Sequence, residues 1–162
     1  MMKEYYNKAE ETTKAFTRIS DPQDPDDDDK HLYFRTGDVV DLDPETSIYT
    51  IKGRTSTDII KHKGYKVSAL EIENVLLSHP NIKECSVVGL DHEVFGQSIT
   101  AVVVKSKAID ADADKEVKSL QAWCSSHLAS YQIPQQVHFV QEIPRNAMGK
   151  VNKKQLAKWI SS

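Results

Sequence analysis

The stretch from Gly53 to Glu73 constrains the fold of this chain more than any other, because the residue pattern changes there from strand to helix. Gly53 tolerates backbone angles that other residues avoid. The three hydroxyl residues at positions 55–57 bond readily to their own backbone, so this segment is weakly committed to a strand ladder. The pattern predicts a hinge at residues 54–58, which divides the chain into residues 1–53 and 59–162.

A helix is predicted shortly after this hinge. The spacing Ser68-x-x-Glu71 has the form of a capping box. In such a box the serine oxygen accepts a hydrogen bond from an unpaired backbone amide, and the glutamate side chain reaches back to the backbone amide of the serine. Apolar residues then recur at helical spacing, which predicts a helix over residues 69–78. Between the hinge and this helix, two short apolar runs at residues 59–60 and 65–67 predict a small hairpin.

The remaining apolar runs predict an α+β fold. We expect strands at residues 32–34, 39–42, 48–51, 82–90, 99–105 and 137–140, and helices at residues 8–16, 114–127 and 153–160. The second of these helices carries one apolar face, made of Val117, Leu120, Trp123, Cys124 and Leu128. Turn-forming residues at 35–38 and 43–47 predict two hairpin turns among the first three strands. The part after the hinge should hold a three-stranded sheet flanked by helices, plus the small hairpin.

Composition excludes several classes of function. The net charge is −3 and no basic face stands out, which argues against a nucleic-acid partner, since phosphate neutralisation dominates such binding. Cys85 and Cys124 lie far apart without a CxxC partner, so we expect buried thiols and no metal site. No apolar run approaches the roughly 18 residues of a membrane span.

An acidic run at residues 21–30 interrupts the first part of the chain. It holds six aspartates and two prolines, a composition typical of a solvated loop. A calcium loop of the EF-hand type would need a central glycine and a final glutamate, which are absent from this run. Its last five residues also match a protease-cleavage sequence used in tags, so the origin of the run stays open.

Three segments carry candidate chemistry. Asp38 follows a tight glycine turn, where a carboxylate can accept hydrogen bonds from a pair of ribose hydroxyls. Arg54 ends a strand, from which a guanidinium can reach a ribose or phosphate. Lys150 lies in a loop bracketed by proline and glycine, where it can neutralise charge that develops in a transition state. Taken singly, each of these three segments is equally typical of an ordinary turn or a solvated side chain. We expect lysines such as Lys63 and Lys105 to be solvated.

In this order, the segments resemble the C-terminal part of the adenylate-forming enzymes, the superfamily of acyl-CoA synthetases, peptide-synthetase adenylation domains and luciferases. The resemblance is carried by Phe-Arg-Thr-Gly-Asp at 34–38, by the stretch 53–73, and by Pro-Arg-Asn-Ala-Met-Gly-Lys at 144–150. Within the superfamily, the segments Gly-Tyr-Lys-Val-Ser-Ala-Leu-Glu and Gly-Lys-Val-Asn-Lys-Lys look closest to the malonyl-CoA synthetase type.

This resemblance implies a ligase that uses ATP with Mg²⁺ and CoA. It activates a small carboxylic acid such as malonate as acyl-AMP and then transfers the acyl group to CoA. Residues 1–53 would be the end of the large N-terminal domain, whose phosphate loop and acyl pocket are expected before this chain, and residues 59–162 would be the mobile C-terminal domain. The chain alone should therefore be inactive. The resemblance suggests a mitochondrial or cytoplasmic location.

The resemblance also assigns roles to residues. Asp38 and Arg54 would bind the nucleotide ribose, and Lys150 would be catalytic, facing the carboxylate and the α-phosphate. An alternative from another class is a non-catalytic binding module that retains the fold, although such a module has no physical need for both Asp38 and Lys150.

The thioester half-reaction would use another face of the mobile domain. There the turn of Lys61, Gly64 and Tyr65 would approach CoA. The spacing from Arg54 to Gly64 is one residue longer than in most relatives, so the pivot lies at Ser56, Thr57 or Asp58, of which Ser56 and Asp58 are the candidates.

Overall fold

The computed structural model describes residues 4–19, 31–106 and 113–161. The chain divides into two compact units, Met1–Asp38 and Val39–Ser162. The acidic run at residues 21–30, for which a solvated loop is expected, lies outside the described residues.

The first unit contains α1 (Ala9–Ala15), β1 (Phe16–Ile19) and β2 (His31–Phe34). The predicted helix is confirmed, but it ends before Phe16, which begins β1 and pairs with Phe34 of β2. The two rings lie 5.3 Å apart. The predicted hairpin turn at residues 35–38 is wrong, because β2 pairs with β1 and not with the strand that follows it. The partner strand lies on the far side of the acidic run, where the local turn pattern could not reveal it.

The second predicted turn is confirmed, between β3 (Asp38–Leu42) and β4 (Tyr49–Arg54), which form a two-stranded sheet. Asp43 organises this turn, because its carboxylate accepts hydrogen bonds from the Glu45 amide (2.9 Å) and the Thr46 hydroxyl (2.6 Å). The Thr46 hydroxyl and then the Glu45 amide hold the pKa of Asp43 below its usual value.

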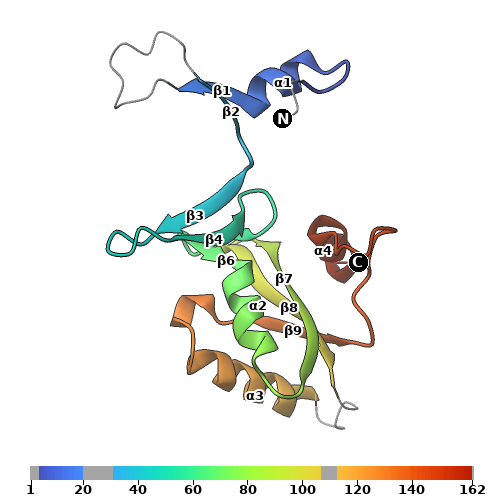
Figure 1. The fold of residues 1–162 in the computed structure, drawn as a ribbon. Helices are drawn as coiled ribbons and strands as arrows, with labels where there is room; N and C mark the ends of the chain where they lie inside the picture. The colour runs from blue at the N-terminus through green and yellow to red at the C-terminus, as the bar shows by residue number, and fades with distance from the viewer. Residues whose placement is uncertain (1–3, 20–30, 107–112, 162) are drawn as a thin grey trace. The chain divides into compact units, whose positions relative to one another are not determined.

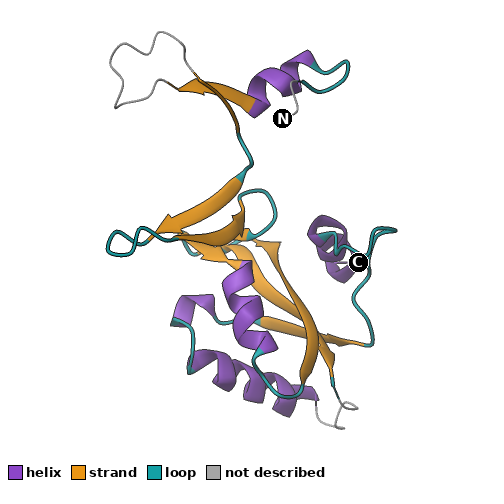
Figure 2. Ribbon diagram, in the orientation of Figure 1, coloured by secondary structure: helices purple, strands orange, loops and turns teal. Residues whose placement is uncertain are grey.

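A five-stranded sheet forms the centre of the second unit (Figures 1 and 2). It comprises β5 (Ile59–His62), β6 (Tyr65–Ser68), β7 (Ile82–His92), β8 (Gly96–Lys105) and β9 (Gln136–Val140). Strand β8 pairs antiparallel with β7 and parallel with β9. The β5–β6 hairpin joins β8 at the pair His62 and Gly96. The predicted three strands and hairpin are therefore present, and one pairing unites them in a single sheet of an α+β fold.

Helices cover both faces of this sheet, as Figure 1 shows. They are α2 (Ala69–Leu77), α3 (Ala113–Ser125) and α4 (Lys153–Ser161), with a 3₁₀ helix, η1 (Ser130–Gln132), before β9. Alternate residues of a strand point to opposite faces. Ile99 and Ala101 of β8 therefore pack in one hydrophobic cluster with α2 and α3, whereas Val102 packs in a second cluster with Leu156 of α4. The apolar face predicted for α3 is confirmed by its buried Leu120.

Helix α2 begins as predicted, because the Ser68 hydroxyl accepts the Glu71 amide at 3.2 Å. The Glu71 carboxylate, however, does not reach back to Ser68 and accepts instead from Gln132 of η1 at 3.0 Å. Ser68 is also the last residue of β6, where it pairs with Ile59. The cap therefore connects a strand, a helix and a distant turn.

The two cysteines are free thiols. Burial raises the pKa of Cys85 to about 12, with a further contribution from Glu73, and burial raises the pKa of Cys124 to about 11. Cys124 is fully buried, as expected, and Cys85 is half-buried. No helix in the described part of the chain is both long and apolar enough to cross a membrane.

Candidate functional site

The loop that carries Lys150 connects β9 to α4 and is shaped by Asn146. The Asn146 Oδ1 atom accepts the amides of Met148 (3.0 Å) and Lys150 (2.9 Å). The backbone of Asn146 exchanges further bonds with the Lys150 carbonyl (2.9 Å) and the Gly149 amide (2.8 Å). One side chain thus holds the loop in a closed turn from within.

The Lys150 ammonium group projects from this closed turn. The side chain is exposed, and within residues 4–19, 31–106 and 113–161 it has no hydrogen-bond or ion-pair partner. Beside it, Arg145 donates to the Gly149 carbonyl (2.8 Å) and forms an ion pair with Glu84 of β7. The loop is therefore fastened to the domain while its lysine is open to a ligand.

The predicted hinge forms a tight turn between β4 and β5. The amides of Thr57 (3.2 Å) and Asp58 (2.8 Å) both donate to the Arg54 carbonyl. Gly53 has φ +120°, and a Cβ there would lie 2.5 Å from the Cβ of Asp58, so only glycine fits. In contrast, Ser56 has no hydrogen bond within the described part of the chain.

Asp58 has several hydrogen-bond and ion-pair partners at this turn. Its Oδ2 atom accepts the Arg54 amide (2.9 Å) and the Thr57 hydroxyl (3.3 Å), and its Oδ1 atom lies 2.7 Å from Nζ of Lys153. Burial by itself raises the pKa of Asp58, but Lys153 and the Arg54 amide outweigh it, so this pKa lies below its usual value. The carboxylate is therefore ionised at neutral pH.

Lys61, Gly64 and Tyr65 lie together in the β5–β6 hairpin. Lys63 (φ +50°) and Gly64 (φ +84°) form its two-residue loop, and both positive angles suit the twist of a tight hairpin. Lys61 donates its amide to Oε1 of Gln97 at 2.8 Å. The Tyr65 ring stacks on Tyr131, with centroids 4.2 Å apart and planes within 9°.

An open cavity of about 550 Å³ lies between the hinge and this hairpin. It is within the size range of small-molecule sites. Its lining includes Lys52, Lys61 and Lys66, together with Glu71 and Tyr131, and Lys52 also pairs with Asp41 at 3.9 Å. The excess of ammonium groups favours an anionic occupant.

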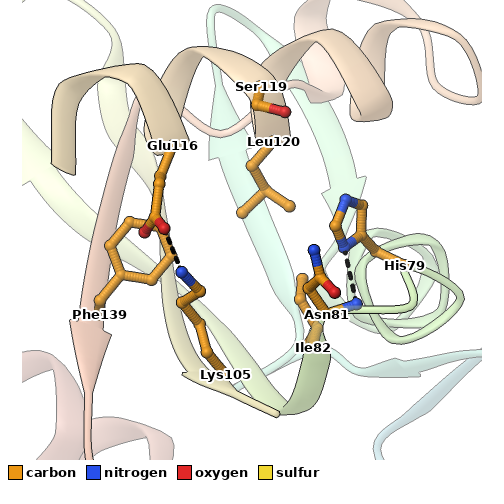
Figure 3. Close-up of a pocket in the computed structure, with 8 residues that line it drawn as sticks. All are labelled: His79, Asn81, Ile82, Lys105, Glu116, Ser119, Leu120 and Phe139. Carbon is orange, nitrogen blue, oxygen red and sulfur yellow. Dashed lines mark hydrogen bonds and ion pairs between the residues drawn. The ribbon is translucent and has the colours of Figure 1, made fainter. Parts of the chain in front are cut away.

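A second pocket lies between α3 and the strands beneath it (Figure 3). Its volume is about 80 Å³, which is far below the roughly 300 Å³ of a small-molecule site. Lys105, expected to be solvated, is only 13% exposed and pairs with Glu116 across this pocket. That expectation is wrong because the end of β8 lies under α3, where the charge needs a partner.

Asp38 and Arg54 belong to different compact units. Asp38 is the last residue of the first unit and is exposed, and its backbone amide donates a hydrogen bond to the Thr36 hydroxyl oxygen (3.2 Å). Arg54 ends β4 in the second unit. The structure brings Arg54, Ser56 and Asp58 together in one turn and Lys61, Gly64 and Tyr65 in another. It shows no hydrogen bond or ion pair between Lys150 and any of them among the described residues.

Several residues that contact the predicted site segments were not predicted from the sequence. Asn146 shapes the lysine loop, Lys153 and Glu73 meet Asp58, and Tyr131 stacks on Tyr65. Asn146, Glu73 and Lys153 lie inside the quoted motifs, but those motifs assigned them no role. Tyr131 gave no signal, because its contact joins segments far apart in the sequence.

Comparison with known proteins identifies relatives of the whole chain. It is 40% identical over 164 residues to a malonate–CoA ligase of Arabidopsis thaliana, covering 98% of this chain and 25% of the relative. It is 45% identical over 158 residues to the mitochondrial malonate–CoA ligase ACSF3 of Mus musculus, covering 98% of this chain and 24% of the relative. The chain thus spans about a quarter of the length of the curated relatives that it matches.

Solved structures show the same fold. The ATP-bound MatB of Rhodopseudomonas palustris matches with a TM-score of 0.77 and 31% identity over 99% of this chain and 28% of that one. The o-succinylbenzoate CoA synthetase of Bacillus subtilis, in complex with its acyl-adenylate, matches with a TM-score of 0.76 and 29% identity over 96% of this chain and 28% of that one. The sequence model of the AMP-binding enzyme C-terminal domain matches residues 71–150. Over these residues, therefore, the chain belongs to the AMP-binding enzyme C-terminal domain family.

Proposed function

We propose that this chain is the C-terminal part of an ATP-dependent acid–thiol ligase, which activates malonate or a related short acid as acyl-AMP and transfers the acyl group to CoA. The observation that carries the proposal is the exposed Lys150 at the tip of a loop that Asn146 holds closed. The malonate–CoA ligases among its relatives support the substrate class.

In the first half-reaction, a carboxylate oxygen of the acid attacks the α-phosphorus of ATP and pyrophosphate leaves. The Lys150 ammonium faces the oxygens on which negative charge accumulates, a kind of interaction worth roughly 3–4 kcal/mol in the transition state. Asp38 accepts hydrogen bonds from the ribose hydroxyls, and the Arg54 guanidinium binds the same sugar or its phosphate. This chain thus supplies charge and orientation for the nucleotide.

In the second half-reaction, the thiol sulfur of CoA attacks the acyl carbon, the bond from that carbon to the phosphate oxygen breaks, and AMP leaves. The hairpin turn of Lys61, Gly64 and Tyr65 faces the incoming thiol. The open space around Gly64, where no atom lies within 4 Å of an added Cβ, is compatible with a closely approaching ligand chain. The lysines of the neighbouring cavity bind phosphate groups.

The two faces alternate by rotation at the hinge, residues 54–58, which separates residues 1–53 from the mobile domain of residues 59–162. Ser56 is the pivot in this proposal, because it lacks the hydrogen bonds of its neighbours among the described residues. Asp58 is bonded to the mobile domain through Lys153, so it moves with that domain.

The Mg²⁺ that accompanies ATP belongs to the nucleotide in this proposal. Among the residues that the structure describes, no group of three or more His, Cys, Asp and Glu side chains could hold a metal ion. No step is therefore assigned to a metal ion held by the described residues. Relatives named as mitochondrial support a mitochondrial or cytoplasmic location for the ligase, which subcellular fractionation would test.

Substitution of Lys150 by alanine tests the proposal in the full-length ligase. Pyrophosphate release from ATP and malonate should fall by about 10²–10³-fold, because one positioned charge is removed from the transition state. Formation of malonyl-CoA from supplied malonyl-AMP and CoA should be unchanged, because that step uses the other face.

The matched control is Lys154→Ala, which removes an exposed lysine of α4. Both half-reactions should persist in this control. Equal loss of both half-reactions in Lys150→Ala would contradict the proposal, and so would unchanged pyrophosphate release. An acid panel with the wild-type enzyme would then define the preferred substrate.

A further inference from the structure

One lysine and two carboxylates meet where the hinge, α2 and α4 come together. The Nζ atom of Lys153 lies 2.7 Å from Oδ1 of Asp58 and 2.8 Å from Oε1 of Glu73. All three side chains are largely buried, with exposed fractions of 13–14%. Burying a charge costs several kcal/mol unless a partner compensates it. This triad is thus a built feature and not an incidental surface pair.

Both carboxylates of the triad also hold a backbone amide. Asp58 accepts the Arg54 amide of the hinge turn at 2.9 Å, and Glu73 accepts the Val87 amide of β7 at 2.7 Å. The ammonium of Lys153 therefore neutralises two groups that each fix the main chain of another element. Without it, two buried like charges would be left side by side, and they would repel each other.

The triad is connected to the Lys150 loop through Lys153. Lys153 is the first residue of α4, three residues after Lys150, and the helix is anchored one turn later by the buried Leu156. The other end of the loop is fastened by the ion pair of Arg145 with Glu84. Lys153 is therefore the second point at which the loop is fastened to the domain. Through Lys153, the loop is attached to Asp58 at the end of the hinge.

We infer that Lys153 is a positioning residue, which ties the base of the Lys150 loop to Asp58, the last residue of the hinge. Rotation at the hinge then carries the loop and Asp58 together as one rigid body. This inference rests on the proposed function. Lys153 does not touch the nucleotide; it acts through the placement of Lys150. A displacement of about 1 Å at a catalytic group can cost about 10²-fold in rate, so a fastening point of this kind has a measurable effect.

The first test measures both half-reactions in the full-length ligase with Lys153→Met, which keeps an unbranched side chain but removes the charge. Pyrophosphate release should fall by about 10–100-fold, while malonyl-CoA formation from supplied malonyl-AMP should stay within about twofold, because that step does not use Lys150. Lys153→Arg should restore most of the loss, and Lys154→Met should behave as wild type. Equal loss in both half-reactions, or no loss, would overturn the inference.

A double variant guards against a fold defect caused by the uncompensated carboxylates. If Lys153 acts through Asp58, then Lys153→Met combined with Asp58→Asn should slow pyrophosphate release no further than Lys153→Met alone. Additive losses would mean that the two residues act independently, which would contradict the tie.

The second test uses the 162-residue chain and does not depend on catalysis. In Lys153→Met and in Asp58→Asn, the Arg54 amide should exchange with solvent about tenfold faster, since it loses the firmly held Asp58 acceptor. In Lys154→Met its exchange should be unchanged. Unchanged exchange in Lys153→Met would overturn the tie, whatever the ligase does. If Lys150→Ala leaves pyrophosphate release intact, the proposed function fails instead. The exchange rate of the Arg54 amide then still shows whether Lys153 holds Asp58 in place.

Discussion

Gly53 and Asp58 share one small space at the hinge, and this residue-scale fit decides how the hinge turn closes. A side chain at Gly53 would meet the Cβ of Asp58 at 2.5 Å, and φ of +120° is in itself unfavourable for any other residue. The close approach lets the Asp58 carboxylate reach the Arg54 amide. A single glycine thus permits the charge contacts that connect the turn at residues 54–58 to α2 and α4.

Replacement of Gly53 by alanine should therefore lower the free energy of unfolding by roughly 2–4 kcal/mol, because a steric clash adds to backbone strain. The control is Gly64→Ala, at φ +84° but with no atom within 4 Å of an added Cβ, for which we expect a loss of about 1 kcal/mol. Urea unfolding of the two variants would measure the difference. Equal destabilisation would show that the contact with Asp58 is unimportant.

At the scale of elements, the loop between β9 and α4 owes its shape to internal bonds and its place to the elements at its ends. Asn146 closes the turn, and the ion pairs of Arg145 and Lys153 fasten it to β7, α2 and the hinge. Residues 144–150 of the loop are exposed, whereas Ile143 and Val151 at its two ends pack in the second hydrophobic cluster. The conformation of the exposed part thus depends on its hydrogen bonds and ion pairs.

Substitution of Asn146 by alanine should loosen this loop without unfolding the domain. The amides of Met148 and Lys150 lose their common acceptor, so their hydrogen exchange should become about tenfold faster. The free energy of unfolding should change by less than about 1 kcal/mol, because the site is exposed. Asn146→Asp keeps an acceptor oxygen and serves as the control. A large loss of stability in Asn146→Ala would show that the loop is part of the folding core.

The elements that could be predicted from the sequence are those with a regular local pattern. The helices at 69–77 and 113–125 and the strands of the central sheet have regular apolar spacing, which local sequence reports. The pairing of β2 with β1 across residues 21–30 was missed, and so was the junction of β5 with β8. Such pairings depend on partners that are distant along the chain, and local spacing carries no information about them.

At the scale of the whole molecule, the candidate nucleotide contacts are distributed over two compact units. Asp38 ends the first unit, whereas Arg54 and Lys150 lie in the second. The chain covers about a quarter of its curated relatives, so the proposed reaction needs residues that the rest of such a ligase would supply.

The 162-residue chain by itself should therefore show no exchange of radiolabelled pyrophosphate into ATP. Its sequence holds no glycine-rich phosphate loop of the kind that cradles nucleotide phosphates, and Asp38, Arg54 and Lys150 without such a loop cannot hold ATP in line with an acid. The full-length ligase under the same conditions is the positive control. Exchange above background in the isolated chain would mean that a complete nucleotide site lies within these residues.

The sequence by itself determined the α+β class, most of the helices and strands, and the three motifs that mark an adenylate-forming enzyme, because each of these is encoded within a few consecutive residues. Only the tertiary structure decided that Lys153, Asp58 and Glu73 form one buried triad and that Tyr65 stacks on Tyr131. Charges and rings in these contacts are separated by 15 to 95 residues along the chain. Their energies depend on burial and distance, and these arise only when the sheet and its helices have packed.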